Sequence, residues 1–199
     1  PFNSWSKLPG PGAKFAHIDL FGTYPVKGYP PLCEAIARYL TASRGVKCTA
    51  EQIVVTNGAQ SAFDLLARLL IEQRDFPEAR KTLTDMRRWK ISPPQLVLLQ
   101  AELSAAEGKW QEAREALEGG RPALAPVSPQ LLAQAALLLG QCYERLGEGE
   151  LELAANRRAA EAGGDNPQAQ AALARTLVRA GRLEEAVGQQ RKLVAAPNA

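Results

Sequence analysis

The sequence predicts a mainly α-helical fold, an α-solenoid of stacked helical hairpins preceded by a short mixed α/β extension. The first observation is a small residue that recurs with steps of 34, 39 and 34 residues. Its four positions are Ala67, Ala101, Gly140 and Ala174. The second observation is a β-branched run at residues 53–56, closed by Asn57-Gly58, which is typical of a buried strand that meets a turn.

Each repeat is interpreted as two amphipathic helices around a short turn. A turn position follows the small residue by seven and keeps the same steps, at Arg74, Gly108, Gly147 and Gly181. A second small residue follows at Ala79, Ala113 and Ala186. Small residues are expected where paired helices approach most closely. Because one hairpin cannot bury both of its faces, neighbouring hairpins must stack.

The predicted hairpins span about 60–92, 93–118, 130–162 and 167–196, within a domain at 58–199. Two features interrupt the pattern. The segment GGRPALAPVSP at 119–129 accounts for the longer step and is expected to form an extended loop, because of its prolines and glycines. In the third hairpin the second small residue is replaced by Glu152, which predicts a helix that slips in register or is lengthened.

The repeat resembles the tetratricopeptide repeat (TPR) over about 60–199. LLLGQCYERLGE (137–148) carries that family's Leu-Gly-x-x-Tyr and its turn glycine, and AEGKWQEAREAL and RAGRLEEAV resemble its second helix. An unrelated helical bundle is the alternative. The resemblance implies a protein-interaction scaffold whose concave groove, lined by the first helix of each hairpin, binds a protein or peptide partner.

Mapping that family's groove positions onto this chain gives a set of charged, polar and apolar candidates. They are Asp64, Arg68, Leu98, Glu102, Leu137, Gln141, Glu144, Arg145, Ala171, Arg175, Val178 and Arg179. This mixture suits a peptide of mixed character. The Lys/Asn pattern with which chaperone-binding members hold a terminal carboxylate is absent. For any single charge, a solvated helix face is the alternative interpretation.

The segment at about 1–70 resembles another family. GYPPLCEAIARYLTASRGVKCTAEQIVVTNGAQSAFDLLARLL (28–70) is similar to fold-type I, pyridoxal-phosphate-dependent aminotransferases, especially the MocR branch of GntR-type regulators. The resemblance implies a helix over 31–42, a strand over 53–56 and a phosphate-binding turn. The backbone of Gly58, Ala59 and Gln60 would contact the phosphate, as helix N-termini often do.

The rest of an aminotransferase site is not expected, since the chain beyond residue 70 has become repeat-like. No lysine there lies in the setting that a Schiff base needs, so we expect no catalysis and no bound cofactor. A MocR-like, effector-sensing fragment that keeps part of the pyridoxal-phosphate site is the alternative.

Without partner strands, 1–57 is expected to be partly disordered, to pack its helix on the first hairpin, or to pair between chains. A natural fusion, a misjoined gene and an artificial chimera all remain open.

Composition narrows the remaining classes of function. The 24 Lys and Arg are scattered among 21 Asp and Glu, which gives little support to nucleic-acid binding. One histidine and three distant cysteines predict neither a metal site nor a disulfide framework. No stretch is long enough for a membrane span and no leader is visible, so a cytoplasmic protein is expected. Because VAAPNA ends the chain without a capping helix, self-association through that end or through the strand 53–56 is also predicted.

Overall fold

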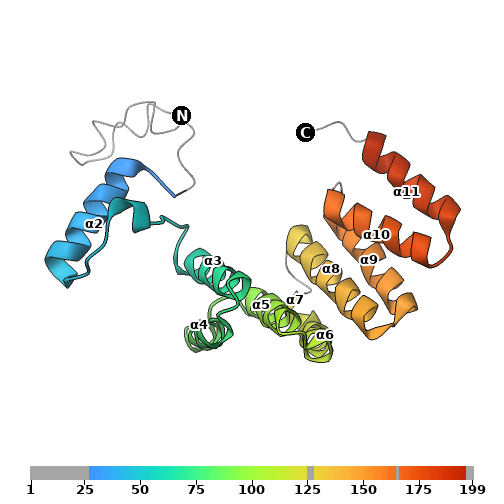
Figure 1. Cartoon of the computed structure of the whole chain (residues 1–199), viewed down its shortest axis with the longest axis horizontal. Helices are drawn as coiled ribbons and strands as arrows, with labels where there is room; N and C mark the ends of the chain where they lie inside the picture. Colours follow the sequence, from blue (N-terminus) through green and yellow to red (C-terminus); the bar gives the residue numbers. More distant parts are fainter. Residues whose placement is uncertain (1–26, 125–127, 165, 196–199) are drawn as a thin grey trace. The chain divides into compact units, whose positions relative to one another are not determined.

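The computed structural model describes residues 27–124, 128–164 and 166–195, and every regular element in these ranges is a helix (Figure 1). The prediction of a mainly helical chain is therefore confirmed. The chain divides into two compact units, Pro1–Ala59 and Gln60–Ala199. Each unit is described by itself below.

The first unit contains the helix α2 (Pro30–Arg44) and the short 3-10 helix η3 (Ala50–Gln52). Helix α2 begins with proline, which is favoured at the first turn because its missing N–H would be unpaired there. The helix ends at Gly45, whose φ of 67° is left-handed. Its buried residues are Cys33 and Ala37, and η3 packs against it. The predicted helix over 31–42 is thus present.

The predicted strand over 53–56 is wrong. Residues 53–56 are extended, but no strand occurs in the described part of the chain. The N–H of Val55 donates a single hydrogen bond of 2.9 Å to the carbonyl of Lys27, which lies in a loop. A strand needs a row of such bonds to a neighbouring strand. The mixed α/β extension is therefore not supported; residues 1–26 of this extension lie outside the described part of the chain.

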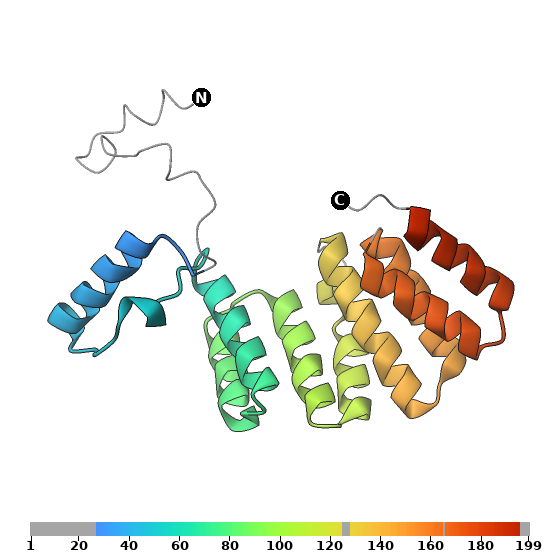
Figure 2. The ribbon, with the colours of Figure 1, turned by 45° about the horizontal axis from the view of Figure 1, so that its top comes forward.

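The second unit is a series of helical hairpins. They are α3 (Ala59–Glu72) with α4 (Phe76–Arg88), α5 (Pro93–Ala106) with α6 (Trp110–Gly119), α8 (Pro129–Leu146) with α9 (Gly149–Gly163), and α10 (Pro167–Arg179) with α11 (Leu183–Ala195). Within this unit, successive hairpins lie side by side in chain order (Figure 2).

Each hairpin turns at the position predicted from the repeat. The four turn residues all have a positive φ: Arg74 (61°), Gly108 (80°), Gly147 (76°) and Gly181 (73°). The second helix then begins two residues later in every hairpin. Glycine adopts this left-handed conformation without the steric cost that a Cβ brings, whereas Arg74 bears that cost.

The recurrent small residues lie in the core of the second unit. Ala67, Ala101, Gly140 and Ala174 are all buried. One apolar cluster joins α3, α4 and α5, a second joins α5 to α9, and a third joins α9, α10 and α11. Because the clusters share helices, apolar packing is continuous from hairpin to hairpin, as the sequence predicted for stacked units.

The insertion at 119–129 is not a fully extended loop. It contains one helical turn, α7 (Arg121–Leu124), and residues 125–127 lie outside the described part. The side chain of Leu124 is buried in the cluster that joins α5 to α9, so burial of this leucine holds the turn against its neighbours. Gly120 comes so close to α5 that an added Cβ would lie 2.3 Å from Cγ1 of Val97.

Helix α9 does not slip in register. The N–H of Glu152 donates to the carbonyl of Glu148, just before the helix, at 2.9 Å. Ala79, Ala113 and Ala186 make the same bond in their own hairpins. Glu152 therefore occupies the alanine position, and the predicted slip is wrong. The predicted lengthening is confirmed, since α9 has 15 residues and the other second helices have 13, 10 and 13.

Candidate binding groove

A groove of about 890 Å³ lies within the second unit, between the third and fourth hairpins. The first helices of these hairpins, α8 and α10, supply most of its lining. The lining residues are Leu137, Gln141, Glu144 and Arg145 of α8; Pro167, Gln168, Ala171, Ala172, Arg175, Thr176 and Arg179 of α10; Glu152 and Asn156 of α9; and Trp110 of α6.

Most of the residues predicted for a groove meet in this one. Seven of the twelve line it: Leu137, Gln141, Glu144, Arg145, Ala171, Arg175 and Arg179. The other five lie elsewhere. Arg68 forms ion pairs with Asp64 on its own helix and with Glu102 of the second hairpin. Val178 is exposed but does not line the groove.

Leu98 was wrongly assigned to the groove. Its side chain is 1% exposed and packs in the cluster that joins α5 to α9. The sequence LVLL at 96–99 gives α5 no polar side at this point, so periodicity alone did not indicate which leucine faces the core.

The wall formed by α9 and α10 carries a buried polar network. Glu152, Asn156 and Thr176 are each at most 5% exposed. Asn156 Nδ2 donates to Thr176 Oγ1 at 2.8 Å, and Thr176 Oγ1 donates to Glu152 Oε1 at 2.6 Å. Buried polar groups need such partners, because an unpaired one costs free energy.

Sequence reasoning missed these network residues and Trp110 as groove residues. The signal was present for two of them: the alanine position of the other hairpins holds Glu152 here. Four residues later, the position of Leu83 in α4 holds Asn156. Two polar residues at consecutive core positions of a single repeat indicate that this hairpin differs from its neighbours.

Arg179 connects the network to the solvent. Its guanidinium pairs with Glu144 on α8 and with Glu152 on α9. Burial lowers the pKa of Arg179, but hydrogen bonds and charge from Glu152 and Glu144 outweigh burial and raise that pKa above its usual value. The arginine is thus fixed in its charged state between two carboxylates.

The two other groove arginines have no carboxylate partner within the described part of the chain. The guanidinium carbon of Arg145 lies 5.3 Å from the ring centroid of Trp110, within the range of a cation–π contact. Arg175 is exposed, and no described residue forms an ion pair or hydrogen bond with its side chain. Both cations are therefore available to an anionic group that enters the groove.

Arg68 occupies in the first hairpin the position that Arg175 occupies in the fourth, and ion pairs neutralise its charge. Arg68 Nη1 donates to both carboxylate oxygens of Glu102, at 2.6 and 2.8 Å, and its Nε donates to Asp64 Oδ2 at 3.1 Å. Burial raises the pKa of Glu102, while the charge and hydrogen bonds of Arg68 lower it in part. Arg68 is therefore already paired with two carboxylates.

Comparison with known proteins gives a partial match. No protein-family model matches the chain. Over 75 residues, 38% of the chain, it is 49% identical to the probable rhizopine catabolism regulatory protein MocR of Rhizobium meliloti. The chain spans only about 15% of the length of that protein. The match supports in part the resemblance predicted for residues 1–70.

The predicted phosphate-binding turn has few of the features of a built site. Gly58 has a φ of 95°, and helix α3 begins at the next residue, Ala59. The side-chain amide of Gln60 is engaged elsewhere, since its Nε2 donates to Gln95 Oε1 at 2.6 Å. A free helix N-terminus can attract an anion, but this one carries no charged side chain within its first turn.

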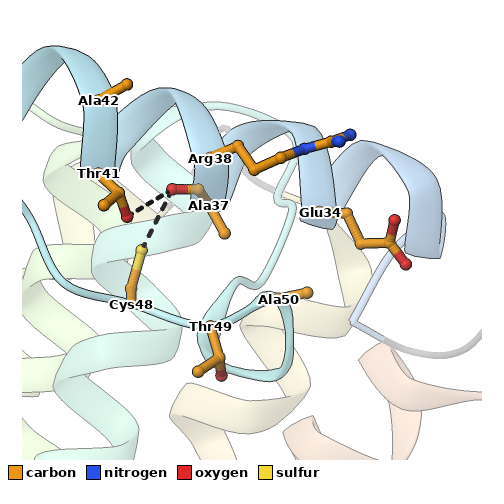
Figure 3. A pocket seen from close by; sticks show the side chains of 8 residues that line it. All are labelled: Glu34, Ala37, Arg38, Thr41, Ala42, Cys48, Thr49 and Ala50. Atoms are coloured by element: carbon orange, nitrogen blue, oxygen red, sulfur yellow. Dashed lines mark hydrogen bonds between the residues drawn. The ribbon is translucent and has the colours of Figure 1, made fainter.

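A second hollow, of about 480 Å³, lies in the first unit between α2 and the segment that leads into η3 (Figure 3). The labelled side chains of Thr41 and Cys48 both point to the carbonyl of Ala37, at 3.0 and 4.0 Å. Their polar atoms are therefore used to join the segment to the helix. The groove of the second unit has the larger set of unpaired polar groups.

In the described ranges, no three His, Cys, Asp or Glu residues come together in a way that could hold a metal ion. A search of the same residues finds no helix long and apolar enough to cross a membrane.

Proposed function

We propose that residues 60–199 form a TPR-like, non-catalytic scaffold that binds a peptide segment of a partner protein in the groove between α8 and α10. The observation that carries this proposal is the convergence of seven predicted positions on one groove of about 890 Å³. Nine of its fourteen lining residues are polar or charged and the other five are apolar or aromatic, so the groove offers hydrogen-bonding groups beside apolar surface. We also propose that the protein acts in the cytoplasm.

The lining supports recognition of an extended peptide. Leu137 and Ala171 provide apolar surface at equivalent positions on the two first helices. Gln141 and Gln168 present side-chain amides that no described residue bonds, and amides can donate to and accept from a peptide backbone. Such a groove offers both contact area and hydrogen bonds along its length.

The proposal is tested by a substitution that fills the groove with a large side chain. Peptides selected from a random library on the whole chain should lose binding when Ala171→Trp places an indole in the groove. The matched control is Ala154→Trp, an exposed position of α9 that does not line the groove. Isothermal titration calorimetry measures the affinities. Peptides that bind both variants equally well would refute the proposal.

A second candidate function rests on the match to the MocR regulatory protein. In this proposal the amino-terminal segment senses an effector and keeps part of a phosphate-binding turn at Gly58–Gln60. Isothermal titration calorimetry of the whole chain with pyridoxal phosphate tests it. Absence of any measurable binding heat at every concentration of the compound would eliminate this candidate.

Self-association stays a prediction. Leu183 and Val187 of the last helix are both exposed, by 60% and 51%, and offer apolar surface at that end of the second unit. Sedimentation velocity on the wild type and on Leu183→Glu with Val187→Glu would measure it, and a concentration-independent monomer would refute it.

A further inference from the structure

Arg175 in the groove lacks the carboxylate counterions that Arg68 has at the equivalent position of the first hairpin. Arg68, Glu102, Gln141 and Arg175 each follow the recurrent small residue of their hairpin by one, so they occupy equivalent places on the four first helices. In the first two hairpins, Arg68 and Glu102 satisfy each other across the contact between α3 and α5.

The last two hairpins break this pairing. The residue that faces Arg175 from the preceding hairpin, by this equivalence, is the neutral Gln141. The residue four positions earlier on the same helix is Asp64 in the case of Arg68, but Ala171 in the case of Arg175. Both carboxylates that neutralise the first arginine are thus replaced by uncharged side chains around the second.

The remaining charges of the groove do not compensate. Its two glutamates, Glu144 and Glu152, are both paired with Arg179. Arg145 lies over the indole of Trp110 and has no carboxylate partner among the described residues. Three arginines and two carboxylates leave the groove a net charge of +1, and the two arginines without a carboxylate partner among the described residues are Arg145 and Arg175.

We infer that the groove binds an acidic stretch of the partner chain, with an Asp or Glu side chain bonded to Arg175 as Glu102 is bonded to Arg68. The inference rests on the proposed function. Arginine suits this role because its planar guanidinium can donate two parallel hydrogen bonds to one carboxylate. The unbonded amides of Gln141 and Gln168 line the same groove and suit the backbone of a chain that passes along it.

The test uses peptides that differ only in charge. Acetylated and amidated peptides rich in Glu are compared with the same peptides carrying Gln, so that neither terminus supplies a carboxylate. A hydrogen bond to a charged group contributes about 1.5–3 kcal/mol, so the Glu peptide should bind the whole chain about 10–100-fold more tightly. Affinity should fall as salt concentration rises.

Three variants locate the effect. Arg175→Gln should remove the preference for the Glu peptide. Arg68→Gln is the matched control and should leave the preference for the Glu peptide unchanged, because Arg68 is already paired with Asp64 and Glu102. Gln141→Glu should supply a carboxylate to Arg175 from within the chain and weaken the Glu peptide by about tenfold or more. Thermal unfolding of each variant shows that it is folded.

The outcomes separate this inference from the proposed function. If Glu and Gln peptides bind equally and Ala171→Trp still abolishes binding, the groove is a peptide site and the acidic preference is refuted. If basic peptides bind best, the inference is likewise overturned. If Ala171→Trp has no effect on any bound peptide, the proposed function itself fails.

Discussion

Gly140 lies where α8 and α9 are in contact. We predict that its replacement changes the free energy of unfolding in a direction that depends on one neighbouring side chain. The other three hairpins carry alanine at the place of Gly140. A Cβ added to Gly140 would lie 2.4 Å from Oδ1 and 2.9 Å from Cγ of Asn156. Asn156 is 5% exposed and donates to Thr176, so its amide cannot move aside without losing that bond.

The magnitude follows from two opposing effects. Overpacking a core typically costs about 1–3 kcal/mol, and loss of the Asn156–Thr176 bond would cost about 0.5–1.5 kcal/mol. Replacement of glycine by alanine inside a helix gains about 1 kcal/mol. We therefore expect Gly140→Ala to lower the free energy of unfolding by about 0.5–3.5 kcal/mol.

The same substitution should have the opposite effect once Asn156 is shortened. In an Asn156→Ala background the steric conflict disappears, so Gly140→Ala should raise the free energy of unfolding by up to about 1 kcal/mol. Urea unfolding followed by far-UV circular dichroism measures all four members of this double-mutant cycle. An equal effect of Gly140→Ala in both backgrounds would refute the close contact on which the reasoning depends.

Three further predictions concern stability. Arg74→Gly should raise the free energy of unfolding by about 0.5–1 kcal/mol, because glycine relieves the left-handed conformation at a cost in unfolded-state entropy; a decrease in urea midpoint would contradict this. Leu98→Ala should lower the free energy of unfolding by about 2–5 kcal/mol, as for other core leucines. A change within experimental error would contradict the burial of Leu98. Burial raises the pKa of Cys142 from 9.0 to about 11 and, with the Glu118 hydrogen bond, that of Tyr143 from 10.0 to about 12. Because the folded state then holds protons that the unfolded state releases, stability should fall as pH rises from about 9 to about 12. Cys142→Ala should flatten the fall between about 9 and 11, and an unchanged pH profile would argue against burial of the thiol.

The sequence predicted the hairpins and their turns because these depend on local rules. Steps of 34 residues and small residues at helix contacts follow from helix geometry and can be counted. The left-handed turn at Gly108 follows from the conformational freedom of glycine. The same local rules failed for residues 53–56, where a β-branched run predicted a strand. A strand depends on a neighbouring strand, and the described chain provides none.

Groove positions were predictable only in part. On α8 and α10 the positions mapped from the tetratricopeptide-repeat resemblance include Gln141 and Arg175, and both residues line the groove. On α5 the pattern was lost in a continuous apolar run, and Leu98 was placed on the wrong side. A helix face can be assigned from sequence only where polar residues mark the other face.

The sequence by itself determined a chain of stacked helical hairpins, because helix periodicity and turn chemistry act between residues a few positions apart. The tertiary structure alone decided which charges neutralise each other. Arg68 meets Glu102 at a separation of 34 residues, and Glu152 is buried against Thr176 at a separation of 24. Such pairings depend on how neighbouring hairpins are placed in space, and the strength of a charge interaction depends on that distance and on burial.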